Sequence, residues 1–223
     1  MRSLLRENKQ FYLAWLTIMV VVGFVITQTE KGDLSLWLNY RHSPMLDAFF
    51  RYATWLGDGI VVGIVCFVLL FVKLRWGIAI SLVSFCSAFL VSLIKKEYNE
   101  PRPSLVFQDM DLHYVDGLEL YRNFSFPSGH TAAAFTLFLL LTFFTRDKRY
   151  AWVYVTLACI VALSRVYLMQ HFLVDVYFGA LFGVVFGTIL YWPFTLLKWE
   201  GKRWAEWGPL KLPGAASPDK TGK

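Results

Sequence analysis

Three short groups of polar residues stand at the edges of long apolar stretches in this 223-residue chain. The groups are Lys95 with Arg102 and Pro103, then Pro127, Ser128, Gly129 and His130, then Ser164 and Arg165 with His171 and Asp175. Charged and ionisable residues are costly beside apolar segments, so their grouping needs a chemical reason. Three cations and two histidines are residue types that can capture a phosphate group and attack its phosphorus.

The cations predict a cradle for a tetrahedral anion. Arg102 and Arg165 offer planar forks that match phosphate oxygens, and Lys95 adds a point charge. Ser128 and Gly129 lie where a helix is expected to begin, and free backbone amides at such a position bind anions. Because phosphoryl transfer depends mainly on positioning and charge stabilisation, this cradle would supply much of the catalysis.

The two histidines predict a nucleophile and an acid. His171 and Asp175 are spaced i and i+4, so on a helix they would share a face. A carboxylate can hold one imidazole N–H, which fixes the tautomer and frees the other nitrogen to attack phosphorus. His130 would then protonate the leaving oxygen. Taken singly, His130 could be a helix cap, Lys95 a membrane anchor, and Arg165 a structural partner of Asp175.

The composition indicates a polytopic membrane protein. Hydrophobic residues make up 57% of the chain and charged residues 17%, whereas a soluble globule carries about 25% charged residues. The net charge of +6 could suggest nucleic acid, but most basic residues flank apolar spans, so no nucleic-acid partner is expected. The three cysteines lie inside apolar runs, which predicts neither disulfides nor a metal site.

The apolar runs predict an all-α bundle of six transmembrane helices. They cover residues 11–28, 59–72, 76–94, 130–145, 151–163 and 173–194. Several are shorter than the ~20 residues that cross a bilayer, so their flanks are expected to extend them. Buried helices of a soluble protein are the alternative, which six spans with Trp or Tyr near many ends disfavour.

The remaining segments complete the expected organisation. Residues 43–56 look amphipathic and predict a helix on the membrane surface. Residues 1–207 are expected to form one transmembrane domain. Residues 208–223 are rich in Pro, Gly, Ser and Lys and predict a disordered cytoplasmic tail.

Charge predicts the orientation of the chain. With six spans, both termini and the turns at 73–75 and 146–150 share one side, which holds 14 of the 22 Lys and Arg but 5 of the 16 Asp and Glu. The positive-inside rule places that side in the cytoplasm and the long loops, 29–58 and 95–129, outside. Since successive helices alternate in direction, all three polar groups are expected at the outer face, where they can converge.

Other polar residues of the outer side predict no second site. His42 and His113 have no obvious partners and are expected to be solvated. The carboxylates between residues 109 and 119 lack EF-hand spacing, so a solvated loop is favoured over a divalent-cation site. Tyr167, inside the third polar group, could either line the site or pack beneath it.

Taken together, the three groups resemble the signature of the type 2 phosphatidic acid phosphatase superfamily, K-x6-R-P, P-S-G-H and S-R-x5-H-x3-D. Every signature position is filled, over residues 95–175. The resemblance implies a metal-independent hydrolase without a cofactor that forms a phosphohistidine, with His171 as nucleophile, Asp175 as its partner and His130 as acid. It also implies a phosphate-binding set consisting of Lys95, Arg102, Ser128, Gly129 and Arg165.

The resemblance implies a lipid phosphate or diphosphate as substrate, in the inner membrane of a bacterium. Bacterial members similar to this chain act on undecaprenyl diphosphate, phosphatidylglycerol phosphate, phosphatidic acid or lipid A phosphates, which the signature does not separate. An outward site favours a lipid of the outer leaflet, such as undecaprenyl diphosphate or lipid A. A vanadate-dependent haloperoxidase is disfavoured because those members resemble soluble proteins. A transporter or scaffold with a vestigial site is disfavoured by the complete signature.

Overall fold

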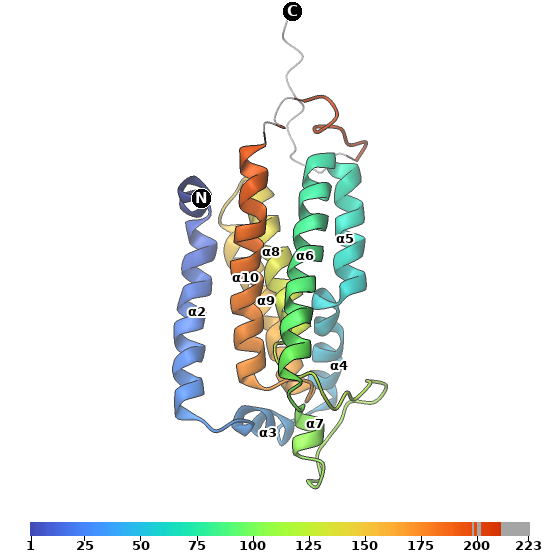
Figure 1. The fold of residues 1–223 in the computed structure, drawn as a ribbon. Helices are drawn as coiled ribbons and strands as arrows, with labels where there is room; N and C mark the ends of the chain where they lie inside the picture. The colour runs from blue at the N-terminus through green and yellow to red at the C-terminus, as the bar shows by residue number, and fades with distance from the viewer. Residues whose placement is uncertain (198, 200–201, 211–223) are drawn as a thin grey trace, which may run out of the picture.

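Six long helices run along a common direction and form a bundle. The computed structural model describes residues 1–197, 199 and 202–210, and every regular element in these ranges is helical, which confirms the predicted all-α class. The long helices are α2 (Lys9–Gln28), α5 (Gly59–Val72), α6 (Leu74–Tyr98), α8 (Gly129–Phe144), α9 (Tyr150–Tyr167) and α10 (Leu173–Leu196) (Figure 1). A helix therefore lies at each of the six predicted positions.

Not every helix satisfies the length and composition expected of a membrane span. Among the described residues, α2, α6 with its continuation to Val106, α9 and α10 are long and apolar enough to cross a membrane. Helix α5 and the segment Pro44–Gly57 before it form a pair bent by 51°, which would make a fifth span. Helix α8 is apolar but has only 16 residues. Four or five spans are thus supported, against the six predicted.

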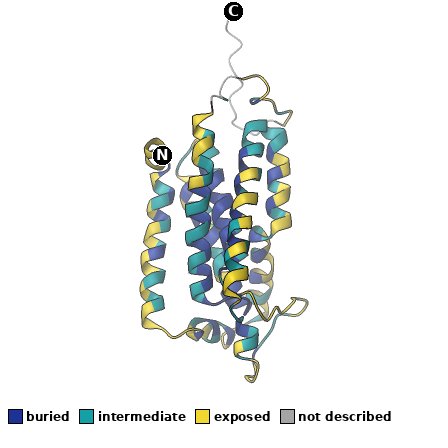
Figure 2. Ribbon diagram, viewed as in Figure 1, coloured by how far each residue is buried: buried dark blue, intermediate teal, exposed yellow. Residues whose placement is uncertain are grey.

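The shortness of α8 goes with its central place in the bundle. It packs against α6, α9 and α10, and its Phe135, Leu139 and Leu140 side chains are almost wholly buried. Figure 2 shows this buried centre and, around it, exposed faces on α2, α5 and α6. Those outer faces carry large apolar side chains such as Phe24, Ile60 and Phe85. Such a surface fits contact with lipid, not with water.

Glycines let α10 approach α8 closely. A Cβ on Gly183 would lie 2.5 Å from the carbonyl oxygen of Ala132, and one on Gly179 would lie 2.7 Å from that of Ser128. Both obstacles are backbone atoms, which cannot rotate away. The start of α8, which carries part of the phosphate cradle predicted above, is therefore held against α10 at a fixed distance.

This contact predicts that Gly183→Ala destabilises the bundle by about 1–3 kcal/mol, because the new methyl group must push α8 and α10 apart. The measurement is thermal unfolding in detergent. Gly63→Ala on α5 is the matched control, since nothing lies within 4 Å of its Cβ position. The control should be neutral or slightly stabilising, because alanine favours a helix over glycine by about 1 kcal/mol. Equal unfolding temperatures for the two variants would contradict the packing argument.

Short helices cover the end of the bundle opposite the N-terminus (Figure 1). They are α3 (Asp33–Asn39), α4 (Pro44–Ala53), the 3-10 helix η1 (Thr54–Gly57) and α7 (Pro103–Val106). Helix α4 begins because the Ser43 hydroxyl accepts the N–H of Leu46 and Pro44 occupies the first turn. The amphipathic segment predicted at 43–56 is therefore α4 followed by η1, with Phe50 packed on Tyr167.

At the N-terminal end, residues 202–210 fold back on the turn between α5 and α6. The N–H of Leu74 donates to the Trp207 carbonyl at 2.8 Å, and that of Leu210 donates to the Phe71 carbonyl at 3.0 Å. Glu206 forms ion pairs with Lys73 and Arg75 at the same turn. Of the disordered tail predicted at 208–223, residues 208–210 belong to this segment, and residues 211–223 lie outside the described residues.

Candidate active site

The three polar groups meet at one end of the bundle. Helix α6 and helix α9 end there, and α8 and α10 begin there, on the side away from the N-terminus (Figure 1). Two contacts join the groups directly. The Ser128 N–H donates to the Asp175 carbonyl at 3.0 Å, and Arg102 donates to the Gln170 carbonyl at 3.1 Å.

His171 lies in the turn before α10 and not on the helix itself, because α10 begins at Leu173. Asp175 sits in the first turn of α10, where its Oδ2 accepts the N–H of Phe172 at 2.9 Å and so caps the helix. His171 Nδ1 is 3.6 Å from this Oδ2, which is longer than a hydrogen bond. The shared helix face expected from the spacing is thus replaced by a capped turn that brings the same two side chains together.

Ser125 lies between the imidazole and the carboxylate. Its hydroxyl donates to Asp175 Oδ2 at 2.5 Å, and its Oγ is 3.5 Å from His171 Nδ1. A serine hydroxyl has one proton. Because that proton is used in the hydrogen bond to Asp175, the oxygen can only accept a hydrogen bond from His171. This contact favours the tautomer in which Nδ1 carries the imidazole proton and the lone pair lies on Nε2. In that tautomer, Nε2 is the nitrogen that could act as a nucleophile.

Burial keeps the His171 imidazole neutral. Its side chain is 2% exposed, and the loss of water lowers its pKa well below the ordinary range, with Arg102 and Arg165 lowering it further. A neutral imidazole is the form that attacks phosphorus. The candidate site therefore keeps a neutral imidazole, the form that could act as a nucleophile, at neutral pH.

This lowered pKa predicts the pH dependence of the reaction. As pH falls, His171 should stay unprotonated past the ordinary imidazole pKa of about 6.5, so the acid limb of kcat/KM should lie below that pH. Replacing Arg102 with Gln removes a cation that lowers the pKa, so the limb should move to higher pH. The measurement is a kcat/KM profile corrected for ionisation of the substrate phosphate. An acid limb at about 6.5 or above in the wild type would contradict the argument.

Arg102 spends most of its donors on the protein. Its Nε donates to the Asn123 carbonyl, one terminal nitrogen donates to both oxygens of Gln170, and the other donates to the Phe124 carbonyl. A guanidinium has five N–H groups, so a single donor is left for an incoming anion among the described contacts. Arg102 therefore anchors the loop between α7 and α8 to the site, and it contributes its charge more than a free fork of donors.

Arg165 keeps a larger share of its donors. Its terminal nitrogens donate to the Thr54 hydroxyl at 2.7 Å and to Gln170 Oε1 at 3.4 Å. Its Nε, also buried, has no partner within the described part of the chain. Three of its five N–H groups thus remain for a phosphate. The alternative partner considered for it, Asp175, is not bonded to it in the described contacts.

The other predicted cradle residues surround these two arginines. Lys95, half-buried at the end of α6, interacts electrostatically with Arg102, Arg165 and Asp175. Ser128 is wholly buried. Its N–H donates to the Asp175 carbonyl on α10, and its hydroxyl caps α8 by accepting hydrogen bonds from Thr131. Ser128 therefore shapes the helix start.

Gly129 offers the closest approach to the backbone. It is the first residue of α8, and nothing lies within 4 Å of the place where its Cβ would be. An anion can therefore reach the amides at this helix start, where the helix dipole favours negative charge.

His130 lies on the first turn of α8 and faces Asp58. Its Nε2 is 3.6 Å from Asp58 Oδ2, and Asp58 is itself fixed as the cap of α5 because its Oδ1 accepts the N–H of Ile60 at 2.8 Å. His130 also interacts electrostatically with Arg165 and Lys95. Cations beside an imidazole disfavour its protonated form, so the negative charge of a bound phosphate would have to offset Arg165 and Lys95 before His130 could give a proton to a leaving oxygen.

Sequence reasoning missed three residues that build the site: Ser125, Gln170 and Asp58. Gln170 is buried and its amide oxygen accepts from Arg102 and Arg165, so it holds the two like charges in one place. The only signals in the sequence were local. Ser125 is a polar residue between two phenylalanines, Gln170 adjoins His171, and Asp58 stands between two glycines.

We expect Ser125→Ala to lower kcat/KM by about 10- to 100-fold. A hydrogen bond to a charged group is worth about 1.5–3 kcal/mol, and its loss leaves both Asp175 and the His171 tautomer less well held. Steady-state hydrolysis is the measurement, with Ser104→Ala as control, since the one described hydrogen bond of the Ser104 hydroxyl goes to the exposed Tyr121 carbonyl. A Ser125→Ala variant as active as the Ser104→Ala control would show that the bridge is unnecessary.

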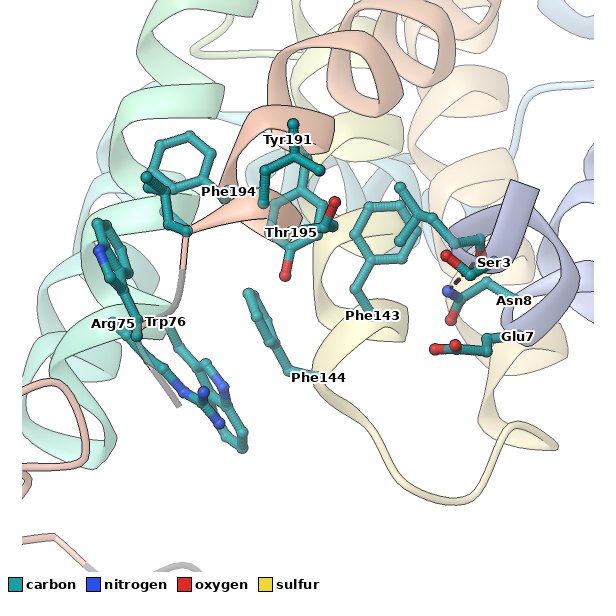
Figure 3. Close-up of a pocket in the computed structure, with 15 residues that line it drawn as sticks. Ser3, Glu7, Asn8, Arg75, Trp76, Phe143, Phe144, Tyr191, Phe194 and Thr195 are labelled. Atoms are coloured by element: carbon teal, nitrogen blue, oxygen red, sulfur yellow. Dashed lines mark hydrogen bonds between the residues drawn. The ribbon is translucent and has the colours of Figure 1, made fainter. Parts of the chain in front are cut away.

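A separate pocket of about 710 Å³ lies at the N-terminal end of the bundle. Figure 3 shows Glu7 and Asn8 on one side of it, Arg75 and Trp76 on the other, and Phe144 between them. Arg75 forms an ion pair with Glu206 at 3.1 Å. The lining of this pocket, over the described residues, contains no histidine. The chemistry described above therefore belongs to the opposite end of the molecule.

Known proteins resemble this chain in sequence and in fold. The family model of the PAP2 superfamily matches residues 73–199. Lipid A 4'-phosphatase of Porphyromonas gingivalis is 28% identical over 187 residues, which is 79% of this chain and 78% of that protein. Bacitracin transport permease protein BcrC of Bacillus licheniformis is 37% identical over 68 residues, which is 30% of this chain and 32% of that protein.

Two solved structures share the helical arrangement. The crystal structure of Aquifex aeolicus LpxE matches with a TM-score of 0.63 and 29% identity, covering 71% of this chain and 92% of that one. A transmembrane PAP2 type phosphatidylglycerolphosphate phosphatase from Bacillus subtilis matches with a TM-score of 0.62 and 22% identity, covering 86% and 98%. The second likeness, at this identity, speaks for the fold alone.

Proposed function

Because this chain, a bacterial integral membrane protein, belongs to the PAP2 superfamily, we propose that it removes a phosphate monoester group from a glycolipid of the lipid A type. Membrane lipid phosphatase activity is the class to which the family match and its relatives point. The observation that carries the proposal is the placement of a neutral, buried His171 among Lys95, Arg102 and Arg165. A nucleophile surrounded by cations suits a phosphate ester.

The proposed reaction has two steps. His171 Nε2 attacks phosphorus while the bond to the lipid oxygen breaks, and His130 gives its proton to that oxygen. In the second step His130 takes a proton from water, the resulting hydroxide attacks the phosphohistidine, and inorganic phosphate leaves. Arg165, Lys95 and the amides at the start of α8 stabilise the charge that spreads over the phosphate oxygens. In this scheme both proton transfers and the nucleophile come from side chains, so no step requires a metal ion.

The choice of lipid rests on the relatives. Two of them, the Porphyromonas gingivalis protein and LpxE, cover most of this chain at 28% and 29% identity. The first is named for a phosphate on lipid A. The match to the transport permease spans only 30% of this chain, which gives little support to a transporter.

A parallel assay tests the proposal. Purified protein in EDTA would be given lipid A, undecaprenyl diphosphate, phosphatidylglycerol phosphate and phosphatidic acid, and phosphate release would be measured as kcat/KM. We expect lipid A to exceed the others by at least about tenfold, which corresponds to 1.4 kcal/mol in transition-state binding. Preference for undecaprenyl diphosphate would overturn the substrate assignment. Lipid binding without phosphate release from any of the four would overturn the enzymatic proposal.

We also propose that both termini are cytoplasmic and that the site faces outward, within a single domain over residues 1–207. The charge asymmetry of the sequence supports this orientation. The end of the bundle that is richer in Lys and Arg is also the end that carries the N-terminus, and such an end is expected in the cytoplasm. A cysteine in place of Asp109 should react with an impermeant thiol reagent in intact spheroplasts. One in place of Arg6 should react only after lysis. The reverse pattern would invert the orientation and leave the chemistry untouched.

A further inference from the structure

A second group of chemically active side chains lies at the outer end of the bundle. His42 and His113 stack face to face with ring centroids 3.7 Å apart, and His113 Nε2 lies 2.9 Å from Asp47 Oδ2. One ligand atom from each of these three residues lies within 4.8 Å of the others. Both histidines were expected to be solvated without partners. The fold instead brings them together from the turn after α3 and from the outer loop.

The surrounding contacts hold this group in place. The buried Asn39 side chain bonds both the N–H and the carbonyl of His113, at 3.1 and 2.7 Å. The Tyr167 hydroxyl donates to Asp47 Oδ1 at 2.6 Å. One oxygen of Asp47 is therefore occupied by a neutral donor and the other faces the imidazoles. Hydrogen-bonded carboxylates and fixed histidine backbones are the supports that surround metal ligands in proteins.

We propose that His42, Asp47 and His113 bind a divalent transition-metal ion, with Zn²⁺ as the best fit. Two imidazole nitrogens and one carboxylate oxygen suit zinc, which takes three protein ligands and leaves a fourth position for water. Ligand atoms around a tetrahedral zinc lie about 3.3 Å apart, as bonds of about 2.0–2.1 Å require. His113 Nε2 and Asp47 Oδ2, 2.9 Å apart, are already near that separation. The remaining change is a tilt of the exposed His42 ring out of its parallel stack with His113, so that its nitrogen turns toward the same point.

The ion would join parts of the chain that also position the phosphate site. Asp47 lies on α4, and Thr54 of η1, directly after α4, accepts a hydrogen bond from Arg165. His113 lies in the loop that continues to Ser125, the bridge between His171 and Asp175. Binding would therefore clamp α4 to this loop and rigidify the outer wall of the site. The ion touches none of the reacting groups proposed above, so its proposed effect is on the position of this wall and not on the phosphate chemistry.

Binding is tested on full-length, metal-stripped protein in detergent, without substrate, so the result does not depend on the proposed phosphatase activity. Titration calorimetry with Zn²⁺ should give one site with a Kd of about 1 µM or tighter. Saturating Zn²⁺ should raise the unfolding temperature by about 3–6 °C. Co²⁺ in its place should give the visible absorption bands of a tetrahedral centre.

Variants distinguish Zn²⁺ binding at these three residues from Zn²⁺ binding elsewhere on the chain. His42→Gln and His113→Gln should each weaken Zn²⁺ binding by at least about tenfold and remove the thermal shift. Asp109→Asn, an exposed carboxylate of the same loop, should leave both unchanged. Because stripped protein is compared with stripped variant, a folding defect would appear as a lower unfolding temperature before metal is added. His42→Ala would then replace His42→Gln. No Zn²⁺ binding by the wild type, or wild-type Zn²⁺ affinity in both histidine variants, would overturn the proposal.

Discussion

His171→Ala is expected to lower kcat/KM by at least about 10⁴-fold, the scale at which loss of a nucleophile leaves only the contribution of charge stabilisation and binding. Alanine removes the Nε2 lone pair that Ser125 and Asp175 hold toward the substrate. Rapid-quench measurement with labelled substrate should then detect no phosphorus on the protein. Lipid binding should remain, because Arg165 and its Thr54 contact are untouched.

His130→Ala provides the matched comparison. It removes the proposed acid but leaves the nucleophile, so with a substrate whose leaving group needs no proton, such as a nitrophenyl phosphate, His130→Ala should still become phosphorylated. The label should accumulate, since the same histidine is needed to activate water. In His171→Ala, no label should accumulate on the protein. Phosphorylation of His171→Ala, or its absence in both variants, would show that the roles have been assigned to the wrong residues.

The meeting of the three polar groups could be predicted from the sequence for a physical reason. Because successive helices alternate in direction, the end of one helix and the start of the next lie on the same side, and every second connection returns to that side. Lys95, His130 and Arg165 therefore had to share a side if the spans were drawn correctly. The apolar runs were clear in the sequence and a helix lies at each of them, although only four or five have the length and composition of a membrane span. Helix ends were less clear. The α10 start at Leu173 depends on the cap from Asp175, and that cap moves His171 off the helix.

Contacts between segments far apart in the chain could not be predicted in this way. Gln170 matters because two arginines from different segments converge on its amide oxygen, and neither periodicity nor spacing encodes that meeting. His113 and Asp47 are 66 residues apart, and His113 belongs to a loop, whose course no helix pattern determines. Helix α8 illustrates the same limit. Its 16 residues look like a short span, and its central position emerges only from packing.

The carboxylate behind His171 is the other residue with a large expected effect. Asp175→Asn keeps the shape of the side chain and an oxygen that can accept from Ser125 and from the N–H of Phe172. It removes the negative charge, which would stabilise the positive charge that develops on the imidazole as Nε2 bonds to phosphorus. Removing one partner of a buried charge pair costs about 3–5 kcal/mol, so we expect kcat/KM to fall by about 10³-fold.

Single-turnover kinetics should place this loss in the phosphorylation step, with little change in lipid binding. Ser125→Ala with Asp175→Asn forms a double-mutant cycle for the bridge. Since Ser125 acts through Asp175, the double variant should be hardly slower than Asp175→Asn alone, whereas independent effects would multiply. Multiplying effects would mean that Ser125 acts on His171 directly. An Asp175→Asn variant with wild-type phosphorylation would mean that the imidazole needs no charge behind it, and that Asp175 serves only to cap α10.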